Sequence, residues 1–132
     1  MQRSDVLNFF PHHHEMVGRW WTAHKWPVIP IKSLPSIGRI AYVDAMPVAA
    51  GFLYLTNSDL AWLEFVVTNP DAPLKARHEG VKLIVENLVV QAKRCGARLV
   101  FTSAKSSGLI SLMQKCGFQK SDEGMTNLIW GA

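Results

Sequence analysis

Residues 61–102 of this 132-residue chain read AWLEFVVTNPDAPLKARHEGVKLIVENLVVQAKRCGARLVFT. The first eight of them are mostly apolar, β-branched or aromatic, which predicts a strand. Residues 74–94 place apolar side chains three and four positions apart, as one face of a long helix does. Residues 98–103 predict a second, buried strand. A strand, a helix and a strand in this order predict a crossover between two parallel strands.

The long helix has one expected core face and one expected end. Gly96 is a suitable residue to end it. The expected apolar face consists of Val81, Ile84, Val85, Leu88, Ala92 and Cys95.

The chain before this unit predicts an antiparallel meander. Strands are expected at residues 37–43 and 48–56, with turns at 44–47 and 57–59, so that residues 61–68 form the third strand of the meander. Nearer the N-terminus we expect a short strand at 6–10, a helix at 11–25 and a proline-rich loop at 26–36.

The chain after residue 103 predicts a short helix and a closing hairpin. Ser106 or Ser107 is suited to cap the helix, and Gly117 to end it. Its expected apolar face consists of Leu109, Leu112, Met113 and Cys116. Closing strands are expected at residues 118–120 and 125–130, around a turn at 121–124.

Length and composition bound the class of protein. Residues 1–132 are enough for one domain, and 48% of them are hydrophobic, so a real core is expected. The longest apolar runs are far shorter than the roughly 20 residues of a membrane span, and we see no secretion signal. We therefore expect a cytoplasmic protein that does not use a membrane. Cys95 and Cys116 lack metal-ligand spacing and are expected to be free, buried thiols.

The net charge of +4 suits an anionic partner. The basic residues are spread along the chain, and no zinc-finger, RNP or basic-zipper pattern occurs. We therefore do not expect nucleic-acid binding, and the charge suits an anionic cofactor equally well.

The segment Leu112-Met113-Gln114-Lys115-Cys116-Gly117-Phe118, together with the order of the expected elements, resembles the GNAT superfamily of N-acyltransferases. The resemblance covers residues 37–130 and is closest to small phage and prophage proteins of this type. It implies an α/β (α+β) fold whose mixed, mostly antiparallel sheet is flanked by helices. In such a sheet the fourth and fifth strands splay apart in a V.

The resemblance also implies acetyl-CoA as co-substrate, and no metal. The pantetheine arm would lie on the fourth strand at Val66 and Val67, where a bulge would leave backbone groups free to bind it. The pyrophosphate would bind where the long helix begins, because free amides and the helix dipole favour an anion there. The residues carried over for cofactor binding are Val66, Val67, Arg77, His78, Gly80, Val81, Lys82 and Ser106. Lys82 replaces the second glycine of the family's motif, and Ser106 replaces an asparagine.

Glu64 is the candidate general base for deprotonating an amine, because an apolar strand would raise its pKa. The alternatives are an outward-facing strand residue or a partner for an arginine. A backbone N–H near Val66 would meet the oxyanion. Met113 occupies the place of the family's tyrosine acid, which leaves Ser111, Cys116 or water as the acid.

Two functions therefore stay open. One is direct acetyl transfer to an amine on a small molecule or peptide, by a monomer or homodimer. The other is a catalytically degenerate GNAT-like module that binds acyl-CoA or a protein partner.

The run His12-His13-His14-Glu15 predicts no metal site, because adjacent helical residues point in different directions. We expect this polar segment to shape the acceptor side instead. Trp20, Trp21 and Trp26 are expected to pack in the core and the loop.

Overall fold

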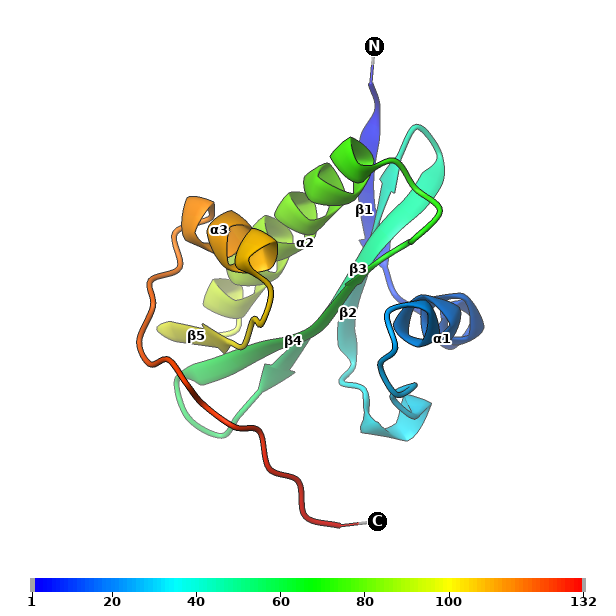
Figure 1. The fold of residues 1–132 in the computed structure, drawn as a ribbon. Coiled ribbons are helices and arrows are strands. Elements are labelled where there is room, and N and C mark those ends of the chain that lie inside the picture. The colour runs from blue at the N-terminus through cyan, green and yellow to red at the C-terminus, as the bar shows by residue number, and fades with distance from the viewer. Residues whose placement is uncertain (1, 132) are drawn as a thin grey trace.

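A computed structural model describes residues 2–131 and contains one five-stranded sheet. Its strands lie in sequence order, and neighbours pair antiparallel except β4 and β5, which are parallel (Figure 1). The strands are β1 (Ser4–Asn8), β2 (Ile37–Val43), β3 (Met46–Leu55), β4 (Leu60–Thr68) and β5 (Leu99–Thr102). The mixed, mostly antiparallel sheet and the parallel crossover predicted from the sequence are confirmed.

Three helices flank the sheet. They are α1 (His14–Ala23), α2 (Leu74–Arg94) and α3 (Ser107–Lys115), and two short 3-10 turns lie at Pro11–His13 and Ile31–Ser33. Apolar residues of α2 and α3 share one core with one face of the sheet. Apolar residues of α1, including Trp20 and Trp21, form a second core on the opposite face. The sheet is therefore covered on both sides (Figure 1).

The β2–β3 hairpin closes more tightly than the sequence predicted. Its turn is Asp44-Ala45, where both residues have positive φ (49° and 68°), and Met46 and Pro47 already belong to β3. Paired positive φ values match the right-handed twist of the flanking strands. The register slips by one residue beside Pro47, as is usual where proline enters a sheet.

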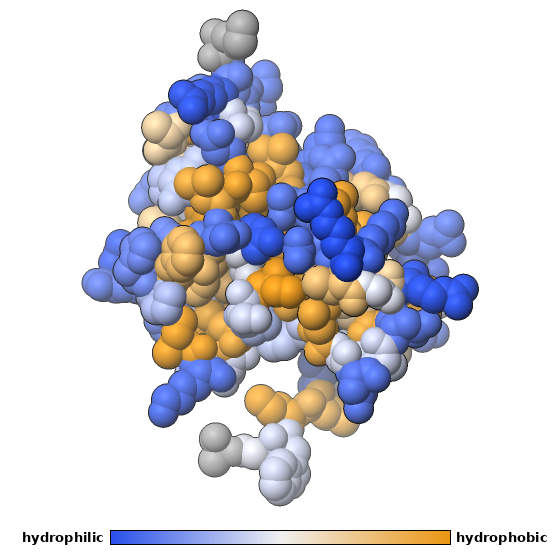
Figure 2. Space-filling view, turned by 180° about the vertical axis from the view of Figure 1, so that it is seen from behind, coloured by the Kyte–Doolittle hydropathy of each residue, from blue (hydrophilic) through white to orange (hydrophobic). Residues whose placement is uncertain are grey.

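The closing hairpin predicted at residues 118–120 and 125–130 is wrong. Between Cys116 and Gly131 the described chain contains no strand. The last apolar side chains lie in solvent, and Figure 2 shows this end of the chain projecting below the body with hydrophobic atoms on it. A strand's side-chain pattern does not supply a partner, and these residues pair with no other strand of the described chain.

Two smaller predictions also need correction. Cys95 was expected in the core but is exposed, because α2 ends at Arg94 and the chain turns away at Gly96 with φ +92°. The first strand was expected at residues 6–10 but runs from Ser4 to Asn8. The helix predicted over 11–25 is confirmed for its middle, residues 14–23.

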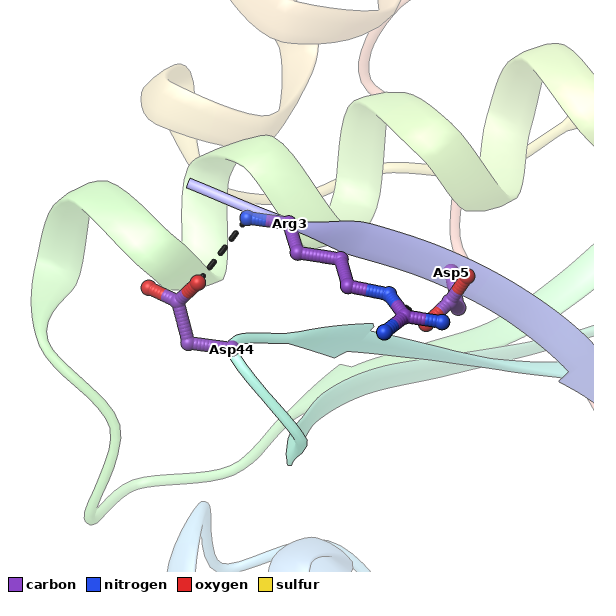
Figure 3. A network of polar contacts seen from close by, with 3 residues as sticks. All are labelled: Arg3, Asp5 and Asp44. Carbon is purple, nitrogen blue, oxygen red and sulfur yellow. Dashed lines mark hydrogen bonds and ion pairs between the residues drawn. The ribbon is translucent and has the colours of Figure 1, made fainter. Parts of the chain in front are cut away.

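Polar contacts explain the early start of β1 (Figure 3). The backbone N–H of Arg3 donates to Asp44 Oδ1 at 2.9 Å, and the N–H of Asp44 donates to the carbonyl of Arg3 at 2.7 Å. These bonds fix the residue before the strand to the β2–β3 turn. The Arg3–Asp5 ion pair beside them, at 3.6 Å, is exposed and contributes little.

Candidate functional site

The sheet forks between β4 and β5. Their parallel pairing stops at Leu63 and Thr102, where the Thr102 hydroxyl donates to the carbonyl of Leu63 at 2.7 Å. Residues 64–68 of β4 continue along β3 but have no partner in β5. One edge of the second half of β4 is thus left without a ladder, as the predicted V-shaped splay requires (Figure 1).

A bulge lies immediately after the fork. Ala50 of β3 pairs with Val67 and Phe52 pairs with Glu64, so two steps on β3 match three steps on β4. Phe65 takes up the extra residue with a φ of 59°, a left-handed conformation that is rare for a bulky side chain. The strand turns here, which directs its backbone groups away from a regular ladder.

Glu64 lies beside the bulge on the α1 side of the sheet. It is half-buried and sits opposite Phe52, which packs in the α1 core. Burial raises the pKa of Glu64 to about 7. Burial also raises the pKa of the neighbouring Tyr54, and the charge of Glu64 adds to that rise. A carboxyl with this pKa can take up a proton near neutral pH. The raised pKa expected from the sequence is confirmed, while the catalytic role of Glu64 stays a proposal.

Aromatic side chains line the strands around Glu64. Tyr54 and Phe65 lie edge to face with centroids 6.0 Å apart, and Trp62 and Phe101 do so at 5.1 Å. The Tyr54 hydroxyl donates to the carbonyl of Ser33 at 2.7 Å, which ties the loop after α1 to β3. Tyr54 was not among the residues predicted from the sequence. Its position opposite Trp62 in the β3–β4 register would have placed it near Glu64.

Val66 and Val67 anchor the unpaired half of β4. Their side chains are 8% and 2% exposed and enter the α2 core and the α1 core respectively. Because both sides of the strand are held, its backbone edge is kept in place without a neighbouring strand. The carbonyl of Thr68, at the strand's end, is bound by His24 Nε2 at 3.0 Å.

The residues carried over from the family's phosphate-binding motif, 77–82, lie inside α2, after its first turn. α2 begins at Leu74, and the N–H of Arg77 already donates to the carbonyl of Pro73 at 3.0 Å. Gly80 and Val81 therefore lie inside the helix, where amides are bonded to the carbonyl four residues earlier. The amides without a place in that ladder are those of Leu74–Ala76, one to two turns earlier.

Gly80 serves packing in this structure. A Cβ at this position would lie 2.5 Å from Val48 Cγ2 and 3.1 Å from the Ala49 Cβ. The absence of a side chain allows α2 to approach β3 closely. Val81 is 4% exposed in the same core.

The first turns of α2 are basic. Arg77 is half-buried, and its Nε is buried without a hydrogen-bond partner among the described residues. His78 and Lys82 lie nearby on the helix, and the first turn contains no acidic residue. The start of α2 thus combines unbonded amides, positive charge and an unsatisfied guanidinium N–H.

α3 lies beside α2. The Ser106 hydroxyl caps this helix by accepting a bond from the N–H of Leu109 at 3.1 Å. Met113, at 3% exposure, is buried in the α2 core and cannot donate a proton. Burial raises the pKa of the half-buried Cys116 thiol, so that group stays protonated at neutral pH.

The described part of the chain contains neither a metal-binding cluster nor a membrane-spanning helix. Within residues 2–131, no group of three or more histidine, cysteine, aspartate or glutamate side chains is placed to hold a metal ion, the run at His12–His14 included. Over the same range, no helix combines the length and apolarity needed to cross a membrane.

This chain matches no known sequence family, but its fold is similar to those of several solved structures. No family model matches this chain, and no curated protein is similar enough to be a relative. Among solved structures, glucosamine-6-phosphate N-acetyltransferase from Arabidopsis thaliana superposes with a TM-score of 0.66 at 14% identity, covering 96% of this chain and 98% of that one. The ribosomal-protein-S18-alanine N-acetyltransferase from Escherichia coli gives 0.70 at 16%, covering 91% and 80%.

A third structure was solved with CoA. Rv2747 from Mycobacterium tuberculosis, in complex with CoA and NLQ, superposes with a TM-score of 0.74 at 15% identity, covering 89% of this chain and 73% of that one. Identities this low speak to the fold, and the fold of this chain is that of the GNAT acetyltransferases, as the resemblance in sequence predicted.

Proposed function

We propose that this protein is an acetyl-CoA-dependent N-acetyltransferase that transfers the acetyl group directly to an amine. The observation that carries the proposal is the fork after Leu63, with a bulged strand edge and a half-buried Glu64 of raised pKa beside it. The GNAT fold supports it, because solved neighbours of this fold are acetyltransferases.

The residues present fit the co-substrate at two places. The amide-rich pantetheine arm matches the unpaired edge of residues 64–68, where Val66 and Val67 hold the strand. The diphosphate matches the first turn of α2, with its unbonded amides at Leu74–Ala76. Acetyl-CoA supplies an acyl group activated as a thioester.

The charged side chains near the start of α2 complete this site. Arg77 would direct its unsatisfied Nε–H to a phosphate oxygen, and Lys82 would add positive charge from the helix surface, with His78 beside them. Ser106 would offer its hydroxyl proton from the start of α3, since the oxygen already accepts the capping bond.

Glu64 would act on the acceptor amine. Its carboxylate would take one proton from the ammonium, and the neutral nitrogen would attack the acyl carbon as the carbon–sulfur bond breaks. A backbone N–H near Val66 would stabilise the developing oxyanion. The nitrogen would lose its second proton as the amide forms, and the leaving thiolate would take up that proton, directly or through water.

A second function is favoured by two specific substitutions. Buried Met113 stands where the family has a tyrosine acid, and Lys82 where it has a glycine. A catalytically degenerate module would keep the fork and bind acyl-CoA without turnover.

Two measurements separate these functions. Calorimetric titration with acetyl-CoA should give a saturable isotherm. Its absence at millimolar ligand would count against the enzyme and against an acyl-CoA-binding module, and would leave a module that binds a protein partner. Release of free CoA thiol should then depend on an added amine from a panel of small amines, peptide N-termini and lysine peptides. If acetyl-CoA binds but no amine of the panel causes release of CoA thiol, the degenerate module is favoured over the enzyme.

A further inference from the structure

The face of the sheet that carries Glu64 is only partly covered. α1 packs on β2, β3 and the second half of β4, and it does not reach β5 (Figure 1). Trp62 lies two residues before Glu64 on β4, so its side chain is on the same face. Phe101 of β5 pairs with Trp62 and faces the same way. The helix therefore leaves this face uncovered over β5 and the first half of β4.

The side chains on this uncovered face are apolar and aromatic. Trp62 is 37% exposed and Phe101 38%, and their rings meet edge to face with centroids 5.1 Å apart. Leu99, two residues before Phe101 on β5, is 54% exposed. Aromatic residues that are open on one side offer a large apolar contact to a further ring. This part of the sheet therefore favours a ligand with an aromatic group.

Glu64 supplies the charge of this face. No other residue of β4 or β5 is charged. Among residues 2–131, no lysine, arginine or histidine forms an ion pair with Glu64, and burial is the cause of its raised pKa. The hydroxyl of the neighbouring Tyr54 donates to the carbonyl of Ser33 instead. A half-buried carboxylate without a cation favours a ligand that brings one.

The spacing of these groups limits the size and charge of the ligand. Residues two apart on a strand lie roughly 7 Å apart. An ammonium group joined to an aromatic ring by two carbons spans this separation. One carboxylate matches one positive charge, and a polyamine would bring further charges onto an apolar surface without partners for them.

We propose that the acceptor is a primary monoamine that carries an aromatic ring, whose ammonium pairs with Glu64 while its ring packs on Trp62 and Phe101. This inference rests on the acetyl transfer proposed above, which it deepens by naming the class of acceptor. In this arrangement the nitrogen lies beside the bulge, at the fork where the thioester is expected, and the ring lies over β4 and β5.

Equilibrium binding tests the site independently of catalysis. Calorimetry with and without CoA should show 2-phenylethylamine binding about tenfold or more tightly than ethylamine, because only the former has a ring to pack on the sheet. Trp62→Thr should reduce its affinity to that of ethylamine, whereas Trp62→Phe should retain the preference. Trp130→Leu, at a tryptophan that is 97% exposed, is the control and should behave as wild type. Equal binding of the two amines, or a preference that survives in Trp62→Thr, overturns the proposal.

Acetyl transfer provides the second measurement. The kcat/KM for release of CoA thiol should be about tenfold or more higher with 2-phenylethylamine than with ethylamine, spermidine or a lysine peptide. If spermidine or the lysine peptide is the better acceptor, the protein is an acetyltransferase but this class of acceptor is wrong. If 2-phenylethylamine binds with the expected preference and no amine is acetylated, the proposed function is wrong and the amine site assigned here stands.

Discussion

At the scale of single residues, Glu64 combines burial with a place beside the bulge. Glu64→Gln removes the proton acceptor but keeps the shape of the side chain. We expect kcat/KM for the best amine to fall by about 10²–10⁴-fold, with acetyl-CoA affinity within about twofold of wild type. Steady-state kinetics and calorimetry measure the two effects. Glu123→Gln, at an exposed residue after α3, is the matched control and should retain full activity.

The pH profile of that same reaction gives a sharper readout. If Glu64 is the base, log kcat/KM should rise with pH and level off above about 7. A profile that stays flat across the neutral range, or one that survives in Glu64→Gln, would remove Glu64 from the mechanism.

Stability should also depend on this carboxyl. Its folded pKa of about 7 lies above the ordinary 4.5, so between these values the folded state binds more protons than the unfolded state. The free energy of unfolding contributed by Glu64 must therefore fall as pH rises through this window. Urea denaturation should show Glu64→Gln gaining stability relative to wild type as pH rises from about 5 to about 8. An equal difference at both pH values would contradict the raised pKa.

At the scale of elements, the contact of α2 with β3 depends on Gly80. A Cβ there would overlap Val48, so Gly80→Ala should destabilise the protein by about 1–3 kcal/mol, as overpacking does. Gly108→Ala on α3 is the control, since a Cβ added there would meet nothing within 4 Å, and it should cause no loss. Thermal and urea unfolding measure both. If Gly80→Ala left the free energy of unfolding unchanged, the packing role of this glycine would be wrong.

The start of α2 makes a separate prediction about the co-substrate. Arg77→Ala should weaken binding of CoA roughly tenfold or more, because a bond to a charged phosphate is lost. Binding of acetyl-pantetheine, which lacks the diphosphate, should not change. Arg94→Ala, at the opposite end of α2, should alter neither. Calorimetry of both variants and the wild type with both ligands measures these effects. If Arg94→Ala weakens CoA binding as much as Arg77→Ala does, the effect comes from the net charge and not from a contact of Arg77.

At the scale of the whole molecule, two cores share one sheet. Trp20 and Trp21 report on the α1 core, while the far-UV signal reports mainly on α2 and its neighbours. We predict a single domain in which tryptophan fluorescence and circular dichroism unfold in one coincident transition. Two separated midpoints would show that the α1 layer unfolds independently.

The sequence predicted the sheet and helices well where one segment's pattern decides its own structure. The spacing of apolar residues located α2 at residues 74–94, and β-branched runs located β2 and β4 to within a residue. Patterns failed where a second segment was needed. The strand expected at residues 125–130 has no partner among the described residues, and the apolar pattern of one segment cannot provide one.

The site divides in the same way. Glu64 and the Val66–Val67 edge follow from the strand pattern and the resemblance to GNAT proteins. Tyr54 depends on hairpin register and was not identified. An anion site at the start of the long helix was expected, but the residues assigned to it were 77–82, whereas the unbonded amides are those of Leu74–Ala76. The similarity to phage-type proteins stays a prediction of the resemblance alone.

Phe65 has a wider consequence. Holding a bulky residue at a φ of 59° costs of order 1–3 kcal/mol, a sizeable part of a small domain's stability. Selection for thermal stability alone would favour sequences that remove this bulge and pair the open edge of the strand. A protein library screened only for heat resistance should therefore accumulate changes around this position, and the sturdiest survivors should be those that no longer hold acetyl-CoA.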